Sequence, residues 1–116
     1  MNNYRRQNIK NIIEEVSSLT VYTDKKKLTS IIDDIVVILV DEQVAFENMP
    51  ENFRHTVRGK ESANAQKHLE YAIDTIEAYI NWYSSLNAKS NINNKKKEAL
   101  ISTIITTLEK AIHGFP

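Results

Sequence analysis

The chain has 116 residues and contains no cysteine. It therefore has no disulfide framework, no zinc site built from thiolates and no cysteine nucleophile. Glycine and proline are also scarce, with 2 residues of each. Because sheet proteins need many turns, this scarcity favours a few long helices joined by short connections. It also leaves no room for the glycine-rich loops of nucleotide-binding enzymes, and neither a P-loop nor a dinucleotide fingerprint occurs.

Net charge and long apolar runs are missing as well. Lys plus Arg and Asp plus Glu both total 15, so the formal net charge is +0. Non-specific nucleic-acid binders usually carry a basic excess, and a nucleic-acid partner is therefore not expected. The longest apolar run, Ile35 to Val40, is far shorter than the roughly 20 residues that span a bilayer. Residues 1–13 lack the apolar stretch of a secretory signal, so we expect a cytoplasmic protein without membrane association.

Hydrophobic residues make up 41% of the chain, enough for one domain of this length to bury a core. Apolar residues recur at helical spacing in four segments. These are about Asn3 to Leu19, from an N-cap at Thr23-Asp24 to about Pro50, about Glu61 to Leu86, and about Asn94 to His113. Gly114 then occupies the C′ position that ends a helix. The sequence predicts one all-α domain over residues 1–116, a bundle of about four helices.

The second predicted helix is the most apolar. Its main stripe consists of Leu28, Ile31, Ile32, Ile35, Ile38, Leu39 and Phe46. Four valines widen this stripe towards most of the circumference: Val36, Val37, Val40 and Val44. A helix of this kind is normally central, packed on two sides or buried in an oligomer. We therefore expect a central second helix and a homodimer, with Val36, Val37 and Val40 as candidate partner contacts.

The connection from Asn48 to Gly59 is the most loop-like stretch. Pro50 stops the second helix on steric grounds, an asparagine side chain can bond the backbone at a helix end, and Gly59 can adopt positive φ. The corner motif is formed by Asn48, Pro50, Asn52 and Gly59. Phe53 and Val57 are expected to hold this connection against the core.

Acidic residues on the third predicted helix suggest an alternative. Glu70, Asp74 and Glu77 share one face, and helical nucleotide hydrolases bind divalent metals through such carboxylates. The second carboxylate motif of those enzymes is missing here, so a solvated acidic face is favoured. No cofactor is expected. The alternative hypothesis is a metal-dependent helical nucleotide hydrolase.

Two other features suggest binding. Lysine triplets begin two predicted helices, Lys25-Lys26-Lys27 and Lys95-Lys96-Lys97, where cations are disfavoured by the helix dipole. Bound phosphate could compensate, which makes a DNA-binding accessory protein the weaker alternative. Tyr79 and Trp82 add aromatic bulk near the end of the third helix, and Trp82 falls off its main apolar stripe. Both are candidate partner contacts.

Residues 41–79 carry a run of specific motifs. They read Asp41-Glu42-Gln43, then Ala45-Phe46-Glu47-Asn48-Met49-Pro50-Glu51-Asn52, then Arg58-Gly59 and Leu69-Glu70-Tyr71-Ala72-Ile73. This stretch resembles a group of small proteins from phages and mobile elements of low-GC Gram-positive bacteria. The resemblance implies a helix–loop–helix hairpin and a phage or mobile-element origin, and it carries over no functional residues. The leading hypothesis is a non-enzymatic interaction or assembly protein whose partner is another protein or a second copy.

Overall fold

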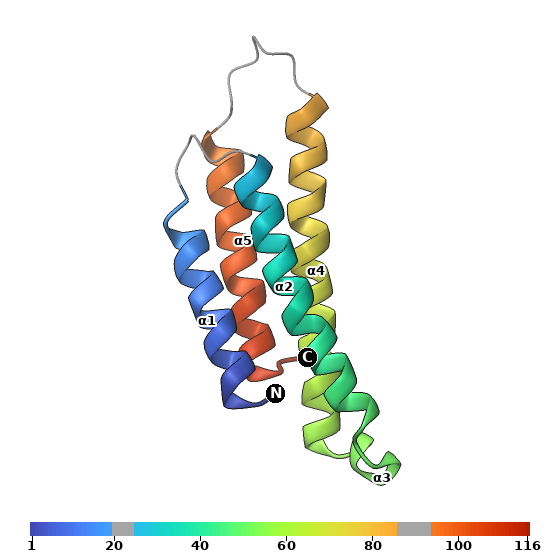
Figure 1. The fold of residues 1–116 in the computed structure, drawn as a ribbon. Helices are drawn as coiled ribbons and strands as arrows, with labels where there is room; N and C mark the ends of the chain where they lie inside the picture. Colours follow the sequence, from blue (N-terminus) through green and yellow to red (C-terminus); the bar gives the residue numbers. More distant parts are fainter. Residues whose placement is uncertain (20–24, 86–93) are drawn as a thin grey trace.

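The computed structural model describes residues 1–19, 25–85 and 94–116. Every regular element in these ranges is a helix (Figure 1). The helices are α1 (Asn3–Ser17), α2 (Lys25–Glu47), α3 (Glu51–Arg54), α4 (Val57–Ser85) and α5 (Asn94–His113). The predicted all-α bundle is confirmed. The predicted N-cap at Thr23-Asp24 lies outside the described residues.

The four long helices pack side by side. α1 packs against α2 and α5, and α4 packs against the same two helices. α2 therefore lies between α1 and α4 and is packed on two sides (Figure 1). Each of the other long helices also packs against two neighbours, so these contacts do not make α2 more central than the rest. Its remaining side faces away from the bundle. Among the described helices, none contains a stretch long and apolar enough to cross a membrane.

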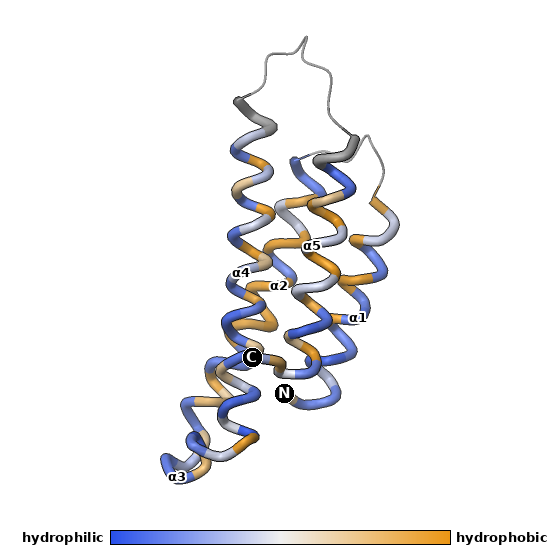
Figure 2. Tube along the Cα trace, turned by 180° about the vertical axis from the view of Figure 1, so that it is seen from behind, coloured by the Kyte–Doolittle hydropathy of each residue, from blue (hydrophilic) through white to orange (hydrophobic). Residues whose placement is uncertain are grey.

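The core receives large side chains from all four long helices. Along each helix, apolar positions recur between polar ones (Figure 2), which is the spacing that places one stripe inside a bundle. The largest fully buried apolar side chains are Ile9, Val16, Ile31, Ile35, Leu69, Ile76, Ile104 and Leu108. Burial of one such side chain stabilises the fold by about 1.5–3 kcal/mol.

Two helix ends are closed by recognisable caps. The Asn2 side chain accepts a hydrogen bond from the Arg5 backbone N–H at 2.8 Å, which caps the start of α1. At the end of α5, Gly114 has φ of +64° and the Phe115 N–H donates to the Lys110 carbonyl at 3.1 Å. This left-handed glycine confirms the predicted C′ position.

The connection between α2 and α4 differs from the prediction. It contains the short helix α3, and α4 begins at Val57 instead of near Glu61. Gly59 lies within the first turn of α4, so the expectation of positive φ is wrong. A Cβ atom at Gly59 would overlap the Arg54 carbonyl group. The glycine is needed because it lets the end of α3 approach α4 closely.

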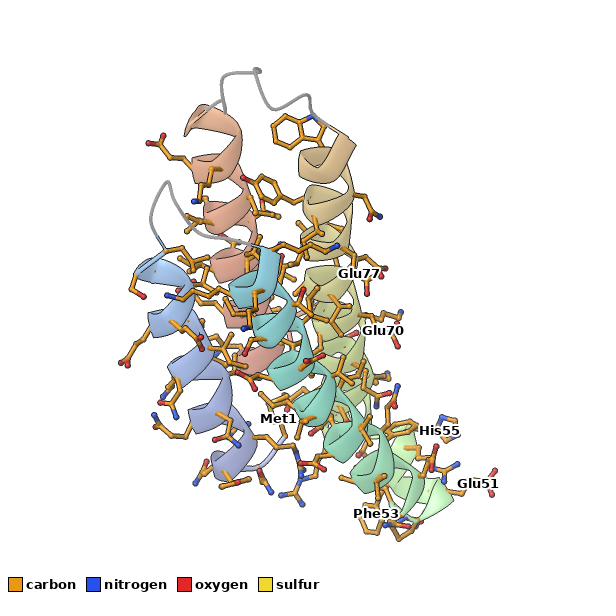
Figure 3. The ribbon with its side chains drawn as sticks, turned by 45° about the horizontal axis from the view of Figure 1, so that its top comes forward. Met1, Glu51, Phe53, His55, Glu70 and Glu77 are labelled. Carbon is orange, nitrogen blue, oxygen red and sulfur yellow. The ribbon has the colours of Figure 1, made fainter. Side chains whose placement is uncertain are left out.

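The expectation that Phe53 and Val57 fasten this corner to the core is also wrong. Phe53 is 50% exposed and Val57 is 73% exposed. The physical reason is the length of α2 and α4, which extend past α1 and α5 at this end (Figure 1). Figure 3 shows Phe53 at the end of this projection, beyond the packed helices. No other helix is there to cover it among the described residues.

Candidate functional site

The outer side of α2 carries a continuous row of exposed valines. Val36, Val40 and Val44 follow one another at intervals of four residues, and Val37 lies beside them, so all four point the same way from the helix. Val36 is 38% exposed, Val37 61%, and Val40 and Val44 are each 48% exposed. We call these four residues the valine face. Contiguous exposed apolar surface of this kind marks interaction sites more often than single exposed residues do.

A groove between α1 and α2 borders the valine face. It has a volume of about 260 Å³ and is lined by Asn8, Asn11, Ile12, Glu15, Asp34, Val37 and Ile38. Val37 belongs to both the groove and the valine face. The groove is apolar at its floor, through Ile12 and Ile38, and polar at its rim.

Charges are segregated along the outer side of α2. Lys25, Lys26 and Lys27 in the first turn are exposed, and so is Glu47 at the last position. The first turn contains no acidic residue and the last turn no basic one. Both ends therefore carry the charge that the helix dipole disfavours. Between them, Asp33 and Asp41 are also exposed.

A buried polar cluster joins three helices near the start of the chain. Glu42 of α2 is 1% exposed. Its Oε2 accepts a hydrogen bond from Arg5 Nε at 2.7 Å, and its Oε1 accepts one from Ser62 Oγ at 2.8 Å. The Met1 amine lies 3.5 Å from the same Oε1. Both carboxylate oxygens are thus used within the fold, and Glu42 fastens α1 and α4 to α2.

This cluster was not predicted, although the sequence contains one indication of it. Glu42 lies three residues after Leu39 and four before Phe46, in line with the apolar stripe. A carboxylate at a stripe position must find partners when it is buried. The sequence does not indicate which cation and which hydroxyl bind the Glu42 carboxylate, because Arg5 and Ser62 are distant from Glu42 along the chain.

The acidic residues of the hydrolase alternative lie on the outside of α4. Glu70, Asp74 and Glu77 are all exposed, and Figure 3 shows Glu70 and Glu77 directed away from the bundle. Within the part of the chain that the structure describes, no group of three or more His, Asp or Glu side chains is placed to hold a metal ion. In residues 1–19, 25–85 and 94–116, the fold brings no second set of carboxylates to these three.

The two aromatic candidates lie where α4 packs against α5. Tyr79 is buried within the core, and Trp82 is half-buried against it. Their ring centroids are 5.6 Å apart with the planes tilted by 45°, a common geometry for aromatic pairs. Together with Thr75, Ala78, Ala99, Leu100 and Thr103 they line a groove of about 320 Å³. Tyr79 thus contributes to the core as well as to this groove.

The two lysine triplets lie at the same end of the bundle, since α2 and α5 both begin there (Figure 1). Lys25, Lys26 and Lys27 are exposed. Lys97 is instead 6% exposed, and this burial lowers the pKa of its amine. The side chains of Lys95 and Lys96 lie outside the described part of the chain. The triplets are therefore not equivalent, because one contributes a lysine to the interior.

Arg54, which was not among the predicted residues of the corner motif, makes the hydrogen bond at the end of α2. Asn48, Pro50 and Asn52 are exposed, and among the described hydrogen bonds neither asparagine side chain bonds the backbone. Arg54 does so instead, since its Nη2 donates to the Glu47 carbonyl at 2.7 Å. Its guanidinium carbon also lies 5.5 Å from the centroid of the Phe46 ring.

Comparison of the chain with protein-family models, with curated proteins and with solved structures finds no match. Its function is therefore inferred from the surfaces described above.

Proposed function

We propose that the protein is a non-enzymatic interaction protein that binds another protein chain through the valine face of α2. The observation that carries this proposal is the exposure of four valines on one face of a well-packed helix. A cytoplasmic site of action and an origin in a phage or mobile element belong to the same proposal. The origin is supported by the resemblance of residues 41–79 alone.

Helix energetics favour a partner for this row. Valine is β-branched and loses side-chain freedom in a helix. At an outward position it is less favourable than Ala by about 0.5 kcal/mol. Inside a core, packing offsets this loss, but these four side chains point away from the core. Burial against a second chain would supply the missing compensation, at about 25 cal/mol per Å² of apolar surface.

The hydrolase alternative receives no comparable support. Its three carboxylates are exposed on one helix, and the buried carboxylate of Glu42 is already paired with Arg5 and Ser62. A general base or metal ligand needs a free lone pair directed at a substrate. The observations favour binding over catalysis.

Site-specific photo-crosslinking tests the proposal. Benzoylphenylalanine is introduced at Val37, which is 61% exposed on the valine face, and separately at Tyr71, which is 56% exposed on α4. Tyr71 is a matched control because it is similarly exposed, belongs to another helix and is already aromatic. Irradiation of the protein, both purified and in cell extract, is expected to give protein adducts from position 37 only. Equal or absent crosslinking at the two positions would overturn the proposal.

A further inference from the structure

We infer that the partner of the valine face is a second copy of this chain, docked antiparallel about a two-fold axis at Val36 and Val37. The inference rests on the proposed function, because it names the partner of the same surface. Three observations carry it: the charges at the two ends of α2, the register of those charges relative to the valines, and the side of the helix on which they lie.

The charges at the ends of α2 are unfavourable in a single helix. Lys26 lies at its positive N-terminus, and the Glu47 carboxylate lies at its negative C-terminus, where Arg54 donates to the Glu47 carbonyl. An antiparallel second copy reverses both effects. Each lysine end then lies beside the C-terminus and the glutamate of the other copy, and the two helix dipoles are opposed.

The spacing of these charges selects one register. Lys26 precedes the midpoint between Val36 and Val37 by as many residues as Glu47 follows it, roughly 16 Å along the helix axis in each direction. An axis at this midpoint therefore places Lys26 of one copy opposite Glu47 of the other. It also places Val36 opposite Val37, and Asp33 opposite Val40 of the second copy. No carboxylate of α2 then faces another carboxylate.

A neighbouring register is disfavoured by the same charges. An axis at Val40 would centre the valine row more evenly, but it would place Asp33 opposite Glu47 of the second copy. Two like charges in contact are destabilising. Lys26 would meanwhile lose its acidic counterpart on the other α2.

The charged residues lie on the same side of α2 as the valines. Lys26, Asp33, Val40, Val44 and Glu47 follow one another at spacings of three, four or seven residues, which keeps them on one face of a helix. The row Val36, Val40 and Val44 is a ridge of the kind that packs into the matching groove of another helix. The face that carries the apolar contact thus also carries the charges that set its direction.

Single-cysteine variants test this register directly, because the chain has no cysteine of its own. In the proposed dimer, Cys at position 37 lies next to the axis, and V37C is expected to form a disulfide-linked dimer under mild oxidation. V44C is the matched control, since it replaces the same residue type on the same face. Its two copies would lie roughly 22 Å apart along the axis, beyond the reach of a disulfide. Dimer formation by V44C alone, or by both variants equally, would overturn the register.

A charge reversal provides the second readout. Lys26→Glu is expected to raise the dimer dissociation constant about tenfold, since two exposed ion pairs are lost and replaced by repulsion. Adding Glu47→Lys to this variant restores the pairs in reversed orientation, and the dissociation constant should return close to its original value. Failure of the double variant to recover, measured by sedimentation equilibrium, would contradict the antiparallel pairing.

The two proposals fail in different ways. If V37C stays monomeric while the photo-crosslinker at position 37 gives adducts that are not dimers of this chain, the valine face binds another protein and the self-association inference is wrong. If position 37 gives no adducts at all, the proposed function itself is wrong.

Discussion

Arg5 Nε lies 2.7 Å from Glu42 Oε2, and this ion pair fastens the first helix of the bundle to the second. The Glu42 side chain is 2% exposed and that of Arg5 is 15% exposed. In such surroundings the attraction between the two charges is only weakly screened by water. The pair also lies where α2 and α4 begin to extend beyond α1, so it marks the end of the four-helix core.

Glu42→Gln is expected to lower the free energy of unfolding by about 3 kcal/mol. The amide removes the negative charge and leaves the partly buried Arg5 guanidinium without its counter-charge. Chemical denaturation followed by circular dichroism measures the change. Asp41→Asn is the control, because Asp41 is the adjacent acidic residue and is exposed, and it should change stability by less than about 0.5 kcal/mol. Equal effects of the two variants would show that the ion pair does not stabilise the fold.

Gly59→Ala is expected to destabilise the protein by about 2 kcal/mol or more. Its methyl group would overlap the backbone carbonyl of Arg54, which cannot move as a flexible side chain can. Thermal unfolding detects the loss. Lys60→Ala serves as the control, since Lys60 is exposed in the same turn of α4 and alanine is a good helix former. A Gly59→Ala protein as stable as the control would contradict the close approach of α3 and α4.

Lys97 is expected to make stability depend on alkaline pH. Burial lowers the pKa of its amine from the ordinary value of 10.5, so the unfolded chain binds this proton more tightly than the folded one. Stability therefore rises as the pH increases from the lowered pKa towards 10.5. Lys97→Met keeps the apolar stem and removes the charge. It should be more stable than the original at pH 7, and its advantage should shrink as the pH approaches 10.5.

Urea denaturation of the original protein and of Lys97→Met at pH 7, 8, 9 and 10 measures the difference in their free energies of unfolding. Lys110→Met is the control, because Lys110 is exposed on the same helix. The difference between the Lys110→Met protein and the original should stay constant with pH. If the stability difference between Lys97→Met and the original is also constant with pH, burial does not disfavour the charged amine of Lys97.

The fold was largely predictable because helical spacing is a local property. The segment Asn94–His113 was predicted with the bounds that it has, since the Gly114 stop signal follows directly from backbone sterics. The corner was predicted less well. Gly59 allows α3 to approach α4 closely, and Phe53 is exposed. Both features depend on how far α2 and α4 project beyond α1 and α5, so they involve all four long helices.

The candidate site was predictable only in part for a related reason. The excess of valines on α2 was visible in the sequence, but whether they were buried by this chain or left for a partner depended on the position of α2 in the bundle. Glu42 shows the opposite case. Its place in an apolar stripe was visible, whereas its partners Arg5 and Ser62 come from other helices and only the fold brings them to it.

Replacing three valines of the valine face should separate stability from binding. A variant with Val37→Ala, Val40→Ala and Val44→Ala is expected to raise the monomer's free energy of unfolding by about 1 kcal/mol or more. Alanine is the better helix former by about 0.5 kcal/mol per position, and little packing is lost at outward positions. Denaturation at low protein concentration measures this gain. Leu69→Ala, a truncation of a fully buried side chain, is the contrasting control and should destabilise by about 2–5 kcal/mol.

At high protein concentration the triple variant should no longer form the dimer, because the apolar surface that a second chain would cover is gone. Destabilisation of the monomer by the triple variant would mean that the valines are held by this chain's own fold, and the argument for a partner would fail with it.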